Sequence, residues 1–422
     1  MIKANNPALS SWISVPSNSD FPIQNIPFGI FQTSEKTARM ATIIGDTVID
    51  LAVLAQAGYF NDLNFDTKVF EQSYINDFMA LGKSVTRAVR DRISDLFEKD
   101  NTELPGNSAL LADLLQPSSS VQMLLPVQIG DYTDFYSSRE HATNVGTMFR
   151  DPDNALLPNW LHLPVGYHGR ASSIVVSGTD IHRPKGQQKP VDAPPVYGPC
   201  KLLDFELEMA FVIGQQTSMG ETISTEAAED YIFGITLFND WSARDIQKWE
   251  YIPLGPFLAK NFASTIAPWI VTLDAVEPFR TDGYDQDPEV LPYLKYEGKR
   301  NYDIKLQVAI QPEKGAEKVV CDSNFKHMYW TMTQQLAHHT VNGCNVNVGD
   351  MCASGTISGP TPDSYGSMLE ISWRGTKPVD MPDGSQRKFI QDGDTVVMRG
   401  WGESKGVRIG FGECSGKILP TT

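Results

Sequence analysis

The chain has 422 residues, with 51 acidic and 35 basic side chains and a formal net charge of -16 at pH 7. A chain of this length is expected to form two or three domains around a large buried core. So negative a charge argues against nucleic acids and anionic membrane surfaces as partners. It leaves an anionic substrate open, because a metal ion and a few basic side chains can reverse the field locally.

The chain contains five cysteines and no C-x-x-C pair. An odd number of thiols, most of them beside apolar residues, favours reduced and buried cysteines in an intracellular protein. The first twenty residues lack the apolar core of a secretory signal, and no apolar run reaches the ~20 residues of a membrane span. We therefore expect a cytoplasmic protein.

The N-terminal third predicts a small β domain with helices. Short β-rich runs fill residues 27–51 and predict a barrel or meander. An apolar stripe at helical spacing over residues 85–97 predicts a helix with Ser84 as its N-cap. Residues 116–120 are rich in Pro and Ser, and we predict the domain boundary there, with domains over residues 1–118 and 119–422.

The larger region is rich in Gly, Pro and short β runs, which is typical of a mixed β domain with helical insertions. Near its start, residues 134–150 predict a helix, or a turn followed by a helix. Asp134 and His141 are seven positions apart and would share one face if the whole segment were helical. A single histidine beside a carboxylate is more often structural than catalytic, so both roles stay open for His141.

Residues 203–209 alternate apolar and acidic side chains with the period of a β-strand. Asp204, Glu206 and Glu208 would lie on one face about 6.6 Å apart, where neighbouring carboxylates repel by about 2–3 kcal/mol at an effective dielectric near 20. A solvated strand face tolerates this repulsion, whereas a strand inside a large domain needs a cation. Oxygen ligands of this kind suit Mg²⁺, Ca²⁺ or Mn²⁺.

The segment 239–251 places Asp240, Arg244, Gln247 and Tyr251 at the spacing of one helix face, with Asp240 before the helix at its positive end. Such a face is either a solvated surface or a metal ligand followed by donors for a developing oxyanion. Lys260 follows in an apolar, turn-rich stretch, which indicates a buried ionic partner.

Two later segments carry polar side chains in unusual surroundings. The loop 354–360, which contains Thr356, is rich in hydroxyl groups and glycine, and such loops can present backbone N–H groups and hydroxyls to a carboxylate. Glu370 lies in a strand-like pattern between Leu369 and Ile371. The sequence has no nucleotide-binding glycine loop, no serine-hydrolase elbow and no H-E-x-x-H motif.

Taken together, these motifs resemble the fumarylacetoacetase family. The segments that carry the resemblance are residues 131–139 with His141, residues 204–208, residues 239–247 and residues 355–359. It extends over essentially the whole chain and includes residues 21–25 and 410–412. Residues 242–245 and the Glu-x-Glu strand are shared with a wider superfamily of acylpyruvate hydrolases, decarboxylases, isomerases and hydratases, whereas the block around His141 and the N-terminal domain are more specific.

The resemblance implies a small N-terminal SH3-like β-barrel domain followed by a large mixed β-sandwich roll, usually in a homodimer. It implies hydrolysis of the carbon–carbon bond of 4-fumarylacetoacetate to fumarate and acetoacetate, the last step of tyrosine and phenylalanine degradation. Another β-diketone or acylpyruvate hydrolase, or a decarboxylase, of the same superfamily is the first alternative. A catalytically silent binding protein on this fold is the second.

The resemblance also implies a role for each candidate site residue. The implied ligands of one Mg²⁺ or Ca²⁺ ion are Asp134, Glu206, Glu208 and Asp240. The implied general base and its partner are His141 and Glu370. The implied groups that stabilise the oxyanion are Arg244, Gln247 and Lys260. The implied contacts of the two substrate carboxylates are Tyr136, Arg150, Tyr251 and Thr356.

One departure from the family pattern follows Lys260. The chain reads Ala263-Ser264 where family members commonly have Gly-Thr. Ser264 keeps a hydroxyl and a carbonyl, so a second, weaker cation site near Lys260 and Ser264 stays in the prediction. The chemistry agrees with the implied activity, because cleaving a β-diketone requires attack at a carbonyl and departure of a carbanion, which a divalent metal and fixed donors favour.

Overall fold

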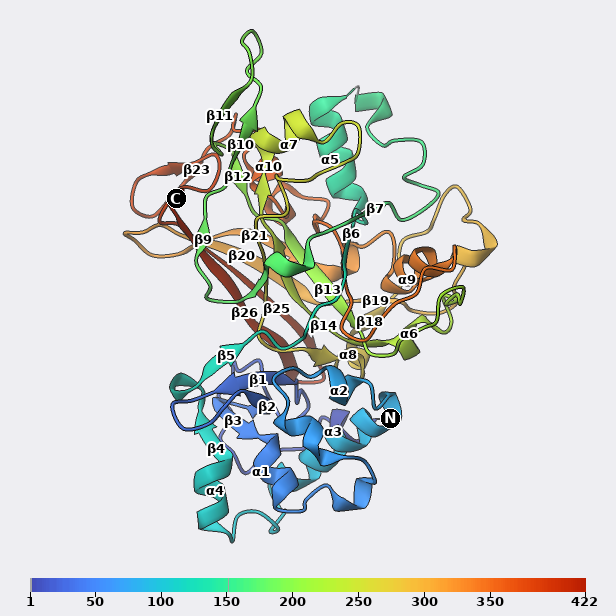
Figure 1. Cartoon of the computed structure of the whole chain (residues 1–422), viewed down its shortest axis with the longest axis vertical. Coiled ribbons are helices and arrows are strands. Elements are labelled where there is room, and N and C mark those ends of the chain that lie inside the picture. The colour runs from blue at the N-terminus through green and yellow to red at the C-terminus, as the bar shows by residue number, and fades with distance from the viewer. Residues whose placement is uncertain (1, 151) are drawn as a thin grey trace.

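The computed structural model describes residues 2–150 and 152–422, which form a small N-terminal part and a larger C-terminal part stacked end to end (Figure 1). The N-terminal part is built on an antiparallel sheet with strand order β4-β3-β2-β1-β5. Its strands are β1 Gly29–Gln32, β2 Arg39–Ile44, β3 Thr47–Asp50, β4 Leu115–Pro117 and β5 Gln122–Leu124. Strands β1 to β3 form the small β unit that the sequence predicts.

Helices cover this sheet and pack apolar side chains against it. They are α1 Leu51–Gln56, α2 Asn76–Met79, α3 Lys83–Phe97 and α4 Ser108–Leu114. The prediction of Ser84 as N-cap is wrong, because Gly82 precedes α3 and Ser84 lies inside the helix. Strands β4 and β5 lie on either side of residue 118 within one sheet, and the domain division at that residue stays a prediction.

The C-terminal part contains a mixed sheet with strand order β7-β6-β22-β13-β14-β16-β8, and β17 pairs with β14. Its strands are β6 Tyr132–Phe135, β7 Gly166–His168, β8 Ile174–Val176, β13 Leu207–Ile213, β14 Ile232–Asp240, β16 Ser264–Ile266, β17 Val271–Thr272 and β22 Met351–Ala353. The pairs β22–β6 and β16–β8 are parallel.

A second sheet, in the order β21-β20-β25-β26-β9, packs against the first and completes a mixed β-sandwich roll. Its strands are β9 Ile181–His182, β20 Lys305–Gln311, β21 Lys318–Asn324, β25 Thr395–Ser404 and β26 Val407–Leu419. Gly400 of β25 lies so close to Leu237 of β14 that an added Cβ would stand 3.1 Å from the leucine side chain. Close packing of the sheets therefore fixes the strands that carry the acidic residues.

Smaller pairs complete the strands near the site. Strands β10 Lys185–Gln188 and β11 Val196–Pro199 form a hairpin that projects from the body of the C-terminal part (Figure 1). The strand predicted over residues 203–209 is divided into β12 Leu203–Asp204, which pairs with β15 Ser242–Ala243, and β13. Glu206 lies in the break and forms a single bridge to Ser367.

Two predictions of local structure need correction, and a third holds in part. Of the two alternatives for residues 134–150, a helix throughout is wrong: α5 Arg139–Phe149 begins later, because Asp134 lies in strand β6 and Ser138 caps the helix. Asp240 precedes helix α7 Arg244–Glu250 as predicted, but as the last residue of β14 it does not share a helix face. Glu370 does not lie in a strand but in α10 Met368–Ile371. The remaining α-helices are α6 Ala228–Tyr231, α8 Leu273–Val276 and α9 Met332–Thr340.

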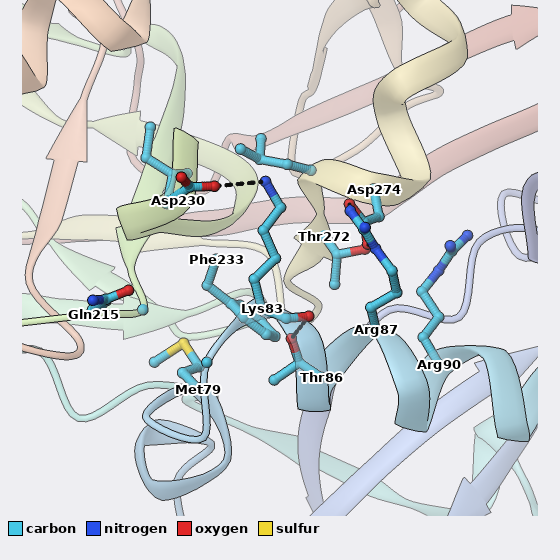
Figure 2. A pocket seen from close by; sticks show the side chains of 14 residues that line it. Met79, Lys83, Thr86, Arg87, Arg90, Gln215, Asp230, Phe233, Thr272 and Asp274 are labelled. Atoms are coloured by element: carbon cyan, nitrogen blue, oxygen red, sulfur yellow. Dashed lines mark hydrogen bonds and ion pairs between the residues drawn. The ribbon is translucent and has the colours of Figure 1, made fainter. Parts of the chain in front are cut away.

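Helix α3 joins the two parts, and Figure 2 shows the cavity between them. Arg87 of α3 donates two hydrogen bonds of 2.6 Å to the carboxylate of Asp274 in α8. Lys83 lies 3.6 Å from Asp230 of α6. Each of the five cysteines is free, and Cys344 alone among them is exposed. Over the described residues, no helix combines the length and apolarity needed to cross a membrane.

Candidate active site

Four buried carboxylates meet at one end of the mixed sheet. Asp134 comes from β6, Glu208 from β13, Asp240 from the end of β14, and Glu206 from the break between β12 and β13. Each offers one oxygen, and the four oxygens lie within 4.8 Å of one another. The strands β6, β22, β13 and β14 are neighbours in the sheet, in that order. Their acidic residues lie at the same end of the sheet, and this brings the carboxylates together.

Two basic side chains face the cluster. Lys260 Nζ lies 2.5 Å from Glu206 Oε2 and 2.9 Å from Asp240 Oδ2. Arg244 Nη1 lies 2.8 Å from Glu206 Oε1, while its Nε pairs with Asp204 at 2.8 Å. Two cations do not balance four carboxylates and Asp204, so the site keeps an excess of negative charge that a divalent cation would neutralise.

The excess charge is visible in the pKa values of the cluster. Burial, and then the charges of neighbouring carboxylates, raise the pKa of Asp134 and of Glu208 well above their usual range. Burial would also raise the pKa of Glu206, but the charges of Lys260 and Arg244 outweigh it and lower that pKa. Asp134 and Glu208 are therefore the two acids that this chain leaves without a cation of its own.

The same two acids have unpartnered oxygens. Among the described residues, Asp134 Oδ1 and Glu208 Oε1 are buried and have no hydrogen-bond partner. The other oxygen of Glu208, Oε2, accepts a 3.0 Å hydrogen bond from the backbone N–H of Gly355. A buried carboxylate oxygen without a partner is strongly disfavoured, so these two oxygens fit a hard cation bound between them.

Asp240 is held by three donors. Its Oδ1 accepts from Ser264 Oγ at 2.9 Å, and its Oδ2 accepts from Tyr167 at 2.8 Å and from Lys260. The charges of Asp240 and Glu206 raise the pKa of Lys260 against the effect of burial, so the ammonium stays protonated. A protonated lysine side chain has no lone pair with which to bind a metal ion. At a second cation site, Lys260 could therefore contribute only its backbone carbonyl, beside the oxygens of Ser264.

A histidine–carboxylate pair lies in the same region. His141, in the first turn of α5, places Nδ1 2.7 Å from Oε2 of Glu370 in α10, and both side chains are buried. Burial alone would raise the pKa of Glu370, but His141, Asn144 and Ser367 together lower it. His141 is also among the groups that lower the pKa of Glu206, so the pair and the acidic cluster share one electrostatic site.

The candidate substrate contacts divide into an inner group, in which Thr356 is buried and Tyr136 half-buried, and an exposed group. Tyr136 follows β6 and packs edge-on against His141, with 5.3 Å between ring centroids. Thr356 Oγ1 is buried and has no partner within the described part of the chain. Arg150 and Tyr251 are exposed, and the Arg150 guanidinium donates to the carbonyl of Ala155.

The oxyanion candidates lie on and after α7. Gln247 is half-buried and accepts a 3.2 Å hydrogen bond from Arg244 Nη1 through its Oε1. Arg244 Nη2 is buried and has no partner in the described residues. The site thus offers a spare guanidinium N–H and the amide of Gln247 beside the Lys260 ammonium.

Four residues in contact with the site were missed by the sequence reasoning: Tyr167, Asn144, Ser358 and Ser367. Asn144 stands three positions after His141, and helical spacing would have placed the two on one face. Ser358 belongs to the hydroxyl-rich loop 354–360, in which the family resemblance assigns a role only to Thr356. Tyr167 lies on a three-residue strand without a local signal.

Comparison with known proteins extends over both parts of the chain. Two family models match, one described as fumarylacetoacetate hydrolase C-terminal over residues 131–419 and one as fumarylacetoacetase N-terminal over residues 24–126. The fumarylacetoacetase of Dictyostelium discoideum is 55% identical over 419 residues, which cover 98% of this chain and 98% of that protein. The fumarylacetoacetase of Homo sapiens is 53% identical over 413 residues, 97% of this chain and 99% of that protein.

The likeness extends to a solved structure at the level of the fold. The fumarylacetoacetate hydrolase of psychrophilic Exiguobacterium antarcticum aligns with a TM-score of 0.52 at 17% identity, covering 94% of this chain and 99% of that chain. At that identity the likeness concerns the fold alone.

Proposed function

The chain belongs to the fumarylacetoacetase family, and from that premise we propose how its buried acidic site acts. The enzyme hydrolyses the carbon–carbon bond of 4-fumarylacetoacetate, releasing fumarate and acetoacetate, in tyrosine degradation. The observation that carries the mechanism is the 2.7 Å contact between His141 and Glu370 beside a cluster of four buried carboxylates.

We propose that Asp134, Glu206, Glu208 and Asp240 hold one Mg²⁺ or Ca²⁺ ion. The two buried carboxylate oxygens that have no partner within the described part of the chain support this assignment. When bound, the ion would polarise a substrate carbonyl and stabilise negative charge on the leaving fragment. A second, weaker cation site beside Lys260 and Ser264 belongs to the same proposal.

His141 acts as the general base in this proposal. Ionised Glu370 accepts the N–H at Nδ1, which leaves Nε2 free to take a proton from water. The water oxygen bonds to the carbonyl carbon on the fumaroyl side as that proton moves to Nε2. The carbon–carbon bond then breaks, its electron pair stays on the acetoacetate carbon, and the proton on Nε2 passes to that carbon.

Negative charge develops on the attacked carbonyl oxygen and needs fixed donors. We assign Arg244, Gln247 and Lys260 to this task. The buried Nη2 of Arg244, which finds no partner in the residues that the structure describes, supports the assignment. Gln247 accepts from Arg244 through its Oε1, which leaves its amide N–H₂ to donate. Donors fixed before the reaction stabilise an oxyanion because they need no reorganisation as the charge forms.

The substrate carries two carboxylates, and we assign them to Tyr136, Arg150, Tyr251 and Thr356. The buried Thr356 hydroxyl, which has no partner among the described residues, supports a polar contact inside the site. Arg150 and Tyr251 are exposed, and the proposal assigns a cation and a phenol to them.

We also propose that the enzyme is a cytoplasmic homodimer. Support comes from a group of exposed apolar side chains at and after the end of α7: Trp249, Tyr251, Ile252, Leu254, Phe257 and Leu258. A group of this size is more typical of an interface than of free surface. Analytical sedimentation at micromolar concentration tests the assembly, and a species of 46.8 kDa would contradict it.

Loss of fumarylacetoacetate, followed spectrophotometrically, tests the function. We expect turnover that a chelator abolishes and Mg²⁺ or Ca²⁺ restores. Acylpyruvates serve as comparison substrates, and faster turnover of an acylpyruvate would assign the chain to another activity of the superfamily. Turnover that is unaffected by exhaustive chelation would refute the metal site.

A further inference from the structure

The carboxylate of Glu370 receives more hydrogen bonds than its histidine partner requires. Ser358 Oγ lies 2.9 Å from each of its two oxygens, and Ser367 Oγ donates to Oε2 at 2.8 Å. Asn144 Nδ2 donates to Oε1 at 2.9 Å. With His141, four side chains from three segments surround this one buried acid.

The surroundings of each donor fix its position. Asn144 stands on α5, one turn after His141, so a single helix presents both to the same carboxylate. The hydroxyl of Ser358 also accepts the backbone N–H of Gly366, and that of Ser367 caps the N-terminus of α10. The donors therefore belong to the framework that holds the two helices together.

Donors of this kind favour the ionised form of a buried carboxylate, which burial alone would disfavour. An ionised Glu370 can only accept at His141 Nδ1, and this fixes the tautomer in which Nε2 has the free lone pair. If Glu370 were neutral, it could donate to Nδ1 instead and leave the proton on Nε2, where no base would be available.

We propose that Asn144, Ser358 and Ser367 are positioning residues that hold Glu370 ionised and oriented, so that His141 presents an unprotonated Nε2 to the substrate. The proposal rests on the proposed role of His141 as base. It assigns no contact with substrate to these three residues, which act through Glu370.

The sign of the expected pH effect follows from charge. The pair formed by His141 and Glu370 can be unprotonated, with the full negative charge on Glu370, or can have gained one proton, which reduces that charge. The three donors stabilise the unprotonated state more than the protonated state. Removing a donor therefore moves the first protonation of the pair, and with it the acid limb of turnover, to higher pH.

Other titratable groups feel the charge of Glu370: Tyr136, Glu140, Cys321 and Tyr365. The pKa values of the two tyrosines and the cysteine are raised from values that are already alkaline, so these groups stay neutral across the acid limb. The pKa of Glu140 is raised mainly by burial, and Glu140 is left intact in every variant.

The test is a graded series of variants in the holoenzyme. Asn144→Leu and Ser358→Ala each remove one donor, and we expect the acid limb of kcat to move upward by about one pH unit, as for one charge-assisted hydrogen bond. Asn144→Asp places a second negative charge beside Glu370, and we expect a larger upward shift. The Kd for fumarate should change less than twofold.

Matched controls separate positioning from general damage to the fold. Thr143→Ala removes a hydroxyl on α5 that donates to the carbonyl of Arg139, and Ser372→Ala removes a buried hydroxyl that donates to the carbonyl of Met368; neither hydroxyl donates to the Glu370 carboxylate. Both controls should keep the wild-type acid limb. An unshifted limb in Asn144→Leu and Ser358→Ala, or equal shifts in the controls, would overturn the proposal.

A readout without turnover distinguishes failure of this proposal from failure of the proposed function. The chain has seven histidines, so the imidazole ¹⁵N signals of His141 can be assigned with His141→Gln. We expect Nδ1 to carry the proton in the neutral wild-type ring, and the titration midpoint of the ring to rise in Asn144→Asp. A ring protonated on Nε2 would refute the positioning role, even if the enzyme proved inactive toward fumarylacetoacetate.

Discussion

At the level of single residues, the site depends on carboxylate oxygens that the protein itself leaves without partners. Glu208 is the clearest case, because one oxygen accepts from Gly355 and the other accepts from no group in the described residues. In Glu208→Gln the amide oxygen can still accept from Gly355, but the negative charge is lost. We expect Mg²⁺ and Ca²⁺ affinity, measured by calorimetric titration, to fall at least about tenfold.

The metal-free form of the same variant should respond in the opposite direction. Removing one of several buried, mutually repelling carboxylates should leave the metal-free protein at least as stable as the wild type in urea. Glu289→Gln, an exposed acid paired with Lys295, is the control and should change neither quantity. Wild-type metal affinity in Glu208→Gln would remove it from the ligand set.

Glu370 should make stability depend on pH in the acid range. Its pKa is lowered from the usual value near 4.5, so between the two values the unfolded chain binds a proton that the folded chain does not. Stability therefore rises with pH in that window, is complete above about pH 4.5, and is lost as pH falls through the folded pKa. We expect the urea midpoints of wild type and Glu370→Gln to converge below about pH 4.5, and a gap that widens there would contradict this.

The sequence predicted which types of residue form the site better than it predicted which of them contact one another. The acids of the strand-like segment 203–209 indicated a hard cation because neighbouring carboxylates on one strand face repel. The contact between His141 and Glu370 joins positions 229 apart, and no local pattern encodes it. Only the resemblance to a family paired these two residues.

At the level of elements, two of the errors share a cause: in a short segment, two periodicities fit equally well. Glu370 alternates with two apolar neighbours as in a strand, yet Ser367 caps the segment and starts a one-turn helix, α10. Asp134 and His141 match helical spacing by coincidence, since β22 and β7 pair with β6 and hold Asp134 in a sheet. Tertiary pairing decided both cases.

The loop after β22 offers a test at this scale. Gly355 has φ of +76°, and a Cβ there would meet the carbonyl oxygen of Phe135 at 2.3 Å. Gly220 has a similar φ of +92° with open space around it. We expect Gly220→Ala to lower the free energy of unfolding by about 1 kcal/mol through backbone strain alone.

Gly355→Ala should lower the free energy of unfolding by about 1–3 kcal/mol more, as for an overpacked core position, because the backbone must move to admit the methyl group. It should also weaken Mg²⁺ binding, since the N–H of Gly355 holds Glu208. Urea unfolding and metal titration measure the two effects. Equal stability losses in both variants would show that the loop tolerates the added methyl group.

At the level of the whole molecule, the site needs the C-terminal sandwich, and α3 ties the N-terminal part to it. Asp274 accepts two hydrogen bonds from Arg87, and its charge also supports Arg90, whose pKa burial lowers to about 10. The Arg87 side chain is 42% exposed, whereas Arg90 is 1% exposed. Loss of the aspartate should therefore matter more than loss of Arg87.

Asp274→Asn is expected to lower the free energy of unfolding by about 1–3 kcal/mol, because it removes the charge that most supports buried Arg90. Arg87→Met should lower it less, because the Arg87 side chain is partly solvated. Urea unfolding provides both values, with Mg²⁺ affinity of the folded protein as the control. A larger loss for Arg87→Met would place the interface energy in the contact between Arg87 and Asp274 instead.

The measurement that tests the central claim most directly is a double-mutant cycle on the base. His141→Gln and Glu370→Gln should each lower kcat for fumarylacetoacetate by about 10²–10⁴-fold, while fumarate and Mg²⁺ still bind. The double variant should be little slower than the slower single variant, because the two residues act as a unit. Losses that multiply in the double variant would mean that His141 and Glu370 work independently and that another group activates the water.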